Sequence, residues 1–100
     1  MWKIEILEKL KSKKIKEIFT KNNIKHLYLT GSYARWENTK DSDIDVLYEV
    51  EKWKRFTLFN IWWIKYNFEK IVWIDLDLVD TNDINKDIKE SINKNKILVF

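Results

Sequence analysis

Two pairs of aspartates are the residues of this sequence best suited to chemistry. Asp43 and Asp45 are separated by one isoleucine, and Asp75 and Asp77 by one leucine. Because side chains alternate across a β-strand, both carboxylates of a pair project from the same face. Carboxylates this close repel each other and raise a pKa unless a cation lies between them. Oxygen-only ligation is typical of Mg2+ or Mn2+, so the pairs predict a divalent-metal site.

A phosphate-binding turn is predicted shortly before the first pair. Gly31, the only glycine, follows the β-rich run of residues 26–30. Glycine at such a turn lets backbone N–H groups approach phosphate oxygens closely, and Ser32 adds a hydroxyl donor. Arg35 could reach a phosphate, with a surface ion pair as the alternative. If the strands of the two aspartate pairs are neighbours, their carboxylates complete one site for in-line phosphoryl transfer.

The order and spacing of these motifs resemble the signature of the polymerase-beta-type nucleotidyltransferase superfamily. That signature is a Gly-Ser pair, a spacer, Asp-hydrophobic-Asp and an aspartate on a later strand. The likeness runs from His26 to the C-terminus and is closest to the minimal nucleotidyltransferase subfamily. It implies that Gly31 and Ser32 hold the triphosphate of ATP. It also implies that Asp43 and Asp45 bind the metal, Mg2+ or Mn2+.

A third carboxylate completes the implied catalytic set. Asp77 fits the family pattern better than Asp75, because Leu-Val follows it at residues 78–79. Asp75 shares the same strand face and stays the alternative ligand. One residue departs from the pattern, since Trp36 stands where these proteins usually have glycine after Ala-Arg. A tryptophan there could reshape the loop over the nucleotide.

The resemblance also implies a partner. The better-known members of the subfamily are antitoxins, encoded beside a small all-helical ribonuclease toxin of the HEPN type, and they transfer AMP from ATP to a toxin tyrosine. One alternative is a module that keeps the fold and neutralises its partner by binding alone. Another is nucleic-acid binding through the lysine-rich segment 9–25. The paired carboxylates favour the enzyme, and a net charge of +3 without a base-reading motif weighs against nucleic acid.

Composition indicates a single globular domain over residues 1–100. Hydrophobic residues make up 45% of the chain, which is enough for one core. The absence of cysteine excludes disulfides and thiolate metal sites. Charges interrupt every apolar run, so we expect neither a signal peptide nor a membrane span, and we expect the protein to be soluble and cytoplasmic.

Hydrophobic periodicity predicts the elements that carry these residues. The predicted helices cover residues 4–19, 51–68 and 84–92, and the predicted strands cover 26–30, 43–50, 71–79 and 97–100. Residues 33–42 are expected to form a polar connection with one helical turn at its start. The predicted fold is two-layer α/β, with a four-stranded sheet and helices packed on one face. The resemblance implies that the sheet is mixed, as in the nucleotidyltransferase fold.

The helix predicted from residue 51 is unusually aromatic. Phe56, Phe59 and Trp63 form one stripe, and Trp62 belongs to another with Leu58 and Ile61. A sheet can cover only one stripe, so we expect the other to dock a partner, either a helical toxin or a second copy of the chain. The alternative is a helix wedged between the sheet and the first helix, with both stripes hidden.

Overall fold

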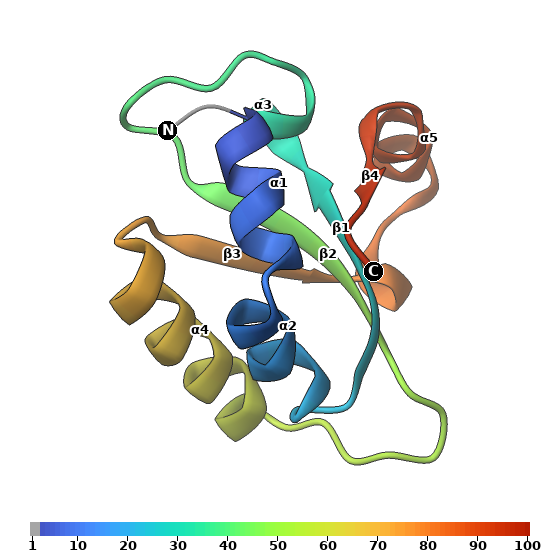
Figure 1. Ribbon diagram of the computed structural model, residues 1–100. Coiled ribbons are helices and arrows are strands. Elements are labelled where there is room, and N and C mark those ends of the chain that lie inside the picture. Colours follow the sequence, from blue (N-terminus) through green and yellow to red (C-terminus); the bar gives the residue numbers. More distant parts are fainter. Residues whose placement is uncertain (1–2) are drawn as a thin grey trace.

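The computed structural model describes residues 3–100 and contains one four-stranded mixed sheet (Figure 1). The strand order is β3-β2-β1-β4. Strand β2 runs antiparallel to β1 and parallel to β3, and β4 pairs antiparallel with β1 at the other edge. The strands are β1 (Ile24–Thr30), β2 (Ile44–Val50), β3 (Leu76–Asp80) and β4 (Ile97–Leu98). The predicted fold class is therefore confirmed.

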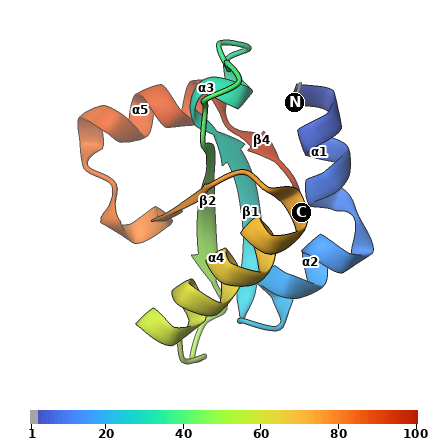
Figure 2. The ribbon, with the colours of Figure 1, turned by 90° about the vertical axis from the view of Figure 1, so that its left-hand side faces the viewer.

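Three helices cover one face of this sheet and enclose the core. They are α1 (Lys3–Lys11), α2 (Lys13–Thr20) and α4 (Leu58–Val72). Alternate strand residues point toward them, and Leu29, Ile44 and Val46 are fully buried there. Helix α5 (Lys86–Asn95) lies on the opposite side of the sheet, with the short α3 (Gly31–Ala34) at the end of β1 (Figure 2). The expectation that the helices pack on one face is therefore wrong for α5. A 3-10 turn, η1 (Thr81–Asp83), follows β3.

The single helix expected over residues 4–19 is two helices. Ser12 interrupts it with an extended backbone, φ −62° and ψ 148°. Its backbone N–H donates to the Lys9 carbonyl at 3.1 Å, and its Oγ accepts from the Ile15 N–H at 3.4 Å. Serine at this position caps the second helix and ends the first, which hydrophobic spacing alone does not show.

The expected boundaries on both sides of α4 are wrong. Residues 51–57 form a connection rather than the start of a helix, so Trp53 and Phe56 are not helical. Helix α4 begins after Thr57, whose backbone N–H donates to the Asn60 side chain at 2.8 Å. At the other end, residues 71–72 belong to α4 rather than to the following strand, and Trp73 ends the helix in the left-handed conformation.

Neither predicted aromatic stripe packs on the sheet as a whole, although Phe56, outside the helix, contacts Tyr48 of β2 with ring centroids 5.1 Å apart. The buried line of α4 is Ile64, Phe68 and Val72. The side chains of the two stripes that lie furthest in solvent are Leu58, Phe59, Trp62 and, less so, Trp63. The expectation that a sheet covers one stripe is therefore wrong, as is the alternative of a wedged helix. The docking of a partner on this face stays a prediction.

Within the described residues, every helix is too short or too polar to cross a bilayer.

Candidate active site

Gly31 lies directly against the first carboxylate pair. Strand register pairs Thr30 of β1 with Asp45 of β2, which brings the turn after β1 beside the start of β2. The backbone of Gly31 has φ +68°, a conformation that glycine adopts at little cost. A Cβ at this position would lie 2.9 Å from both Cβ and Cγ of Asp45. Glycine is therefore required twice here, by its backbone angle and by the approach of the Asp45 side chain.

Asp45 and Asp77 are neighbours across two parallel strands. Their Cα atoms are register partners, and the two side chains share a hydrogen bond. Ile44 and Leu76, on the other face of the same strands, are fully buried in the core. The predicted alternation is confirmed for Asp45, which projects away from the core with Asp77. Asp43 lies just before β2, and its charge acts on Asp45.

The electrostatics of this cluster centre on Asp45. Partial burial is the largest cause that raises its pKa, which reaches about 6 from the usual 3.8. The hydrogen bond and the charge of Asp77 raise the pKa further, followed by the charge of Asp43. The positive charge of Arg35 acts in the opposite direction. The structure thus brings Asp43, Asp45, Asp77 and Arg35 within electrostatic reach of one another.

Asp75 occupies a different position from Asp77. Its backbone carbonyl accepts a hydrogen bond of 2.9 Å from the Ile44 N–H, which ties the start of β3 to β2. Its side chain is exposed, and the hydrogen-bonded partner of Asp45 is Asp77. The choice between Asp75 and Asp77 as third ligand stays a prediction, but this geometry favours Asp77.

The donor set fits a hard divalent cation by its chemistry. All three carboxylates offer oxygen, and a cation would relieve the repulsion by Asp77 and Asp43 that adds to the effect of burial on Asp45. Within residues 3–100, no three acidic, histidine or cysteine side chains already converge as tightly as metal ligands do. A cation would therefore have to draw the three carboxylates closer together.

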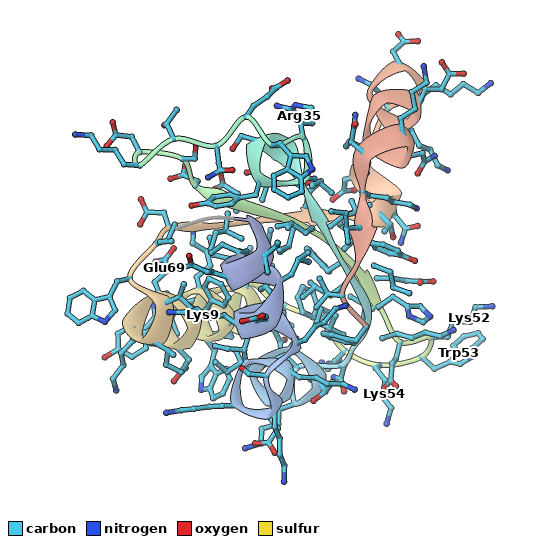
Figure 3. All side chains as sticks on the ribbon, turned by 45° about the horizontal axis from the view of Figure 1, so that its top comes forward. Lys9, Arg35, Lys52, Trp53, Lys54 and Glu69 are labelled. Atoms are coloured by element: carbon cyan, nitrogen blue, oxygen red, sulfur yellow. The ribbon has the colours of Figure 1, made fainter. Side chains whose placement is uncertain are left out.

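Ser32 and Arg35 stand on the turn that follows β1. Ser32 is the second residue of α3, and its carbonyl accepts from the Glu37 N–H at 2.9 Å. Arg35 follows α3 and extends into solvent (Figure 3), where its Nε donates to the Glu37 carboxylate at 3.0 Å. The surface ion pair given above as the alternative for Arg35 is thus present. A phosphate contact would require Arg35 to exchange Glu37 for the phosphate.

Two positioning residues escaped the sequence analysis. Tyr33 is buried beneath α3 and anchors the Gly-Ser turn to the core, and burial raises its pKa. Glu69 of α4 accepts a hydrogen bond of 2.7 Å from the Leu76 N–H, which holds the start of β3. An aromatic residue directly after Gly-Ser was a usable signal for Tyr33. The sequence contains no such signal for Glu69, because its hydrogen-bond partner is a backbone group.

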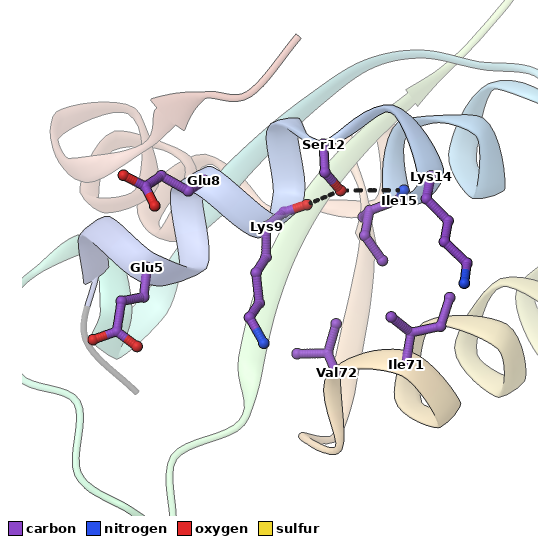
Figure 4. A pocket seen from close by; sticks show the side chains of 8 residues that line it. All are labelled: Glu5, Glu8, Lys9, Ser12, Lys14, Ile15, Ile71 and Val72. Carbon is purple, nitrogen blue, oxygen red and sulfur yellow. Dashed lines mark hydrogen bonds between the residues drawn. The ribbon is translucent and has the colours of Figure 1, made fainter.

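The hollows on the helical side contain none of these residues. The groove between α1, α2 and α4 has a volume of about 380 Å³ and is lined by residues such as Lys9, Ser12, Ile15 and Val72 (Figure 4). A second, apolar hollow lies on α4 against Leu58, Phe59 and Trp62. The carboxylates lie instead on the opposite face of the sheet.

Comparison with known proteins gives relatives over nearly the whole chain. Residues 13–100 match the family described as "Polymerase beta, Nucleotidyltransferase". Two proteins of Methanocaldococcus jannaschii carry the name "putative protein adenylyltransferase". One is 37% identical over 98 residues, covering 95% of each chain, and the other is 34% identical over 80 residues, covering 80% of this chain and 84% of the relative.

Solved structures share the fold at lower identity. A structure described as a "putative minimal nucleotidyltransferase" superposes with a TM-score of 0.77 at 23% identity, covering 97% of this chain and 95% of the other. A toxin–antitoxin structure with AMP-PNP gives 0.70 at 20% identity, covering 87% and 70%. A tri-AMPylated HEPN toxin of Shewanella oneidensis in complex with its MNT antitoxin gives 0.65 at 19% identity, covering 93% and 71%.

Proposed function

We propose that this chain, which belongs to the polymerase beta nucleotidyltransferase family, transfers AMP from ATP to a tyrosine hydroxyl of a helical HEPN-type toxin. By this transfer it acts as the antitoxin of that toxin. The observation that carries the proposal is that Gly31, directly after β1, lies against Asp45, the register partner of Asp77. Relatives named as protein adenylyltransferases and structural neighbours that are toxin–antitoxin complexes support the choice of a protein acceptor.

Each residue has a distinct role in this reaction. Gly31 and Ser32 bind the triphosphate through backbone N–H groups and the serine hydroxyl. Asp43, Asp45 and Asp77 would hold Mg2+ or Mn2+, and the metal would neutralise phosphate charge. The tyrosine oxygen attacks the α-phosphorus, the bond to the bridging oxygen breaks, and pyrophosphate leaves.

Proton transfer in this proposal falls to the Asp45–Asp77 pair. Asp45 and Asp77 share a hydrogen bond in which one carboxyl group carries the proton, and the pKa of Asp45 is raised to about 6. We assign the proton of the tyrosine hydroxyl to Asp77, which lies at the sheet edge and is exposed to an incoming acceptor.

The test is transfer of label from ATP to a purified HEPN-type partner encoded beside this gene. Label at the α-phosphate should enter the partner, and label at the γ-phosphate should not. Asp77→Asn should reduce transfer by about 10²–10⁴-fold, the range for loss of a general base. Asp75→Asn is the matched control and should retain most activity. Absence of α-label from the partner would exclude AMP transfer, and a larger loss in Asp75→Asn would reverse the assignment of Asp77.

Neutralisation by binding alone is the second candidate, and the exposed apolar surface of α4 is the observation that favours it. Leu58, Phe59 and Trp62 are exposed there, and a toxin that docked on them would be covered without AMP transfer. A double variant, Asp45→Asn with Asp77→Asn, separates the candidates in a ribonuclease assay of the toxin. If AMP transfer is the mechanism, the variant binds the toxin but leaves its ribonuclease active. If the variant still neutralises the toxin, occlusion is the mechanism.

A further inference from the structure

Three tryptophans of this chain occupy a backbone conformation that suits glycine. Trp36, Trp53 and Trp73 have φ of 62°, 66° and 64°. The other described residues with positive φ are Gly31 and Asn23, which are residue types that tolerate this conformation. A bulky side chain there brings its Cβ against the following carbonyl oxygen. One tryptophan in such a position would be an outlier, and three in one small chain require a common explanation.

Trp36 stands at the glycine position of a helix-terminating motif. The Glu37 N–H donates to the Ser32 carbonyl at 2.9 Å, and the Trp36 N–H donates to the Tyr33 carbonyl at 3.4 Å. These are the two bonds of a Schellman motif, six-to-one and five-to-two, and its left-handed residue is usually glycine. The motif ends α3, the helix that begins at Gly31.

Trp73 repeats the arrangement at the end of α4. Its backbone is left-handed, with φ 64° and ψ 25°, and its N–H donates to the Glu69 carbonyl at 2.9 Å. This five-to-one bond defines the simpler left-handed helix end, where glycine again predominates. Trp73 therefore holds the residue position at which helices of this kind normally stop.

Trp53 is the third residue of a tight turn. The Lys54 N–H donates to the Glu51 carbonyl at 3.3 Å, which closes a four-residue turn after β2. Turns with positive φ at the third residue favour glycine or asparagine there. Figure 3 shows the Trp53 ring between Lys52 and Lys54, directed away from the body of the molecule.

Burial does not offset the strain at these positions. The exposed fraction is 64% for Trp36, 101% for Trp53 and 87% for Trp73. Large aromatic side chains contribute to stability mainly by removing apolar surface from water. Here the fold bears the cost of the left-handed backbone and leaves the apolar surface in solvent.

We infer that the working protein carries glycine, not tryptophan, at positions 36, 53 and 73. The chain has six tryptophans and one glycine, whereas glycine is usually one of the commonest residues. Glycine in place of tryptophan at these three positions would bring both numbers closer to the usual proportions. A single cause can exchange tryptophan for glycine at all three positions. Different genetic codes assign a codon such as UGA to stop, tryptophan or glycine, and the source organism decodes it as glycine. Glycine at 36 would free the turn beside Gly31 and Asp45 from a bulky indole.

The inference does not extend to Trp62 and Trp63. Both lie within α4, where the backbone is helical and glycine has no conformational advantage. Those two residues therefore provide an internal comparison for positions 36, 53 and 73.

The decisive experiment reads the gene and the natural protein together. The expected result is UGA at all three codons and, in tryptic peptides of protein isolated from the source organism, the mass of glycine at each position. UGG codons, or peptides that contain tryptophan at these positions, would overturn the inference.

Recombinant variants test the structural premise separately. Trp36→Gly, Trp53→Gly and Trp73→Gly should each raise the midpoint of thermal unfolding by several degrees, of order 5 °C, because each relieves one left-handed side chain. Trp63→Gly is the control and should lower the midpoint, since glycine weakens a helix interior. If the three variants melt no higher than the parent chain, the strain argument is wrong and the inference falls with it.

Discussion

Replacing Asp45 with asparagine is expected to stabilise the metal-free protein while abolishing its response to metal. The pKa of Asp45 is raised to about 6 because burial, Asp77 and Asp43 all disfavour its charge. Asparagine removes that charge and keeps the shape of the side chain. Its amide can still donate a hydrogen bond to the Asp77 carboxylate. The substitution thus isolates the electrostatic cost of the cluster.

The size of the effect follows from the pKa. A rise of about two units corresponds to about 3 kcal/mol if fully realised. The Asp45 side chain is only partly buried, so solvent screening reduces this to about 1 kcal/mol. For a domain of this size, that is an increase of about 4–8 °C in the midpoint of thermal unfolding.

The pH dependence has a definite sign. A carboxyl group whose pKa is raised by folding binds its proton more tightly in the folded state than in the unfolded state. Its contribution to stability is complete below pH 3.8 and is lost as pH rises through about 6. The advantage of Asp45→Asn should therefore be largest above pH 7 and should vanish toward pH 4.

The assay is thermal unfolding followed by circular dichroism with a chelator present, at pH 7.5 and pH 4. Asp75→Asn is the matched control, because it removes an exposed carboxylate near the same strand end. Mn2+ with ATP should then raise the midpoint of the wild type and leave that of Asp45→Asn unchanged. A midpoint for Asp45→Asn that is no higher than wild type at pH 7.5, or an equal gain in Asp75→Asn, would refute the reasoning.

Three further changes test other parts of the structure. Gly31→Ala should lower the free energy of unfolding by about 1–2 kcal/mol from the left-handed backbone alone. It should also weaken ATP binding, and chemical denaturation with ATP titration would measure both effects. Glu69→Ala should cost about 1–3 kcal/mol because it leaves the first N–H of β3 without its acceptor, whereas Glu69→Gln should retain most stability; equal losses would show that the hydrogen bond does not matter. Trp62→Glu should leave the circular dichroism spectrum unchanged and abolish association with a toxin or a second copy. Light scattering after size exclusion would measure this association. A wild type that stays monomeric beside the toxin would contradict a docking role for α4.

The sequence was sufficient to predict the strands around the candidate site. Strand β1 ends at Thr30 and β2 begins at Ile44, close to the expected limits, because alternation and the glycine define both ends. The same alternation predicted that Asp45 and Asp77 project away from the core. Their pairing across β2 and β3 required the parallel register, which no local pattern contains.

The errors in the prediction have physical causes. Ser12 ends one helix and caps the next while the hydrophobic spacing continues across it. Trp53 and Trp73 caused the errors around α4, because their apolar side chains fit the predicted helix 51–68 and the predicted strand 71–79. Both are turn residues with left-handed backbones. Glycines at these two positions would have indicated the turn after β2 and the end of α4.

The candidate site forms only when the strands of the sheet pair in the correct register. Thr30, Asp45 and Asp77 lie in one row across β1, β2 and β3. Because strand side chains alternate, a slip of one residue in β2 or β3 would turn a carboxylate into the core and a leucine or isoleucine out to solvent. Such a chain would be both unstable and inactive. If the chain transfers AMP as proposed, an activity titration should therefore count the fraction of chains that have paired their strands correctly.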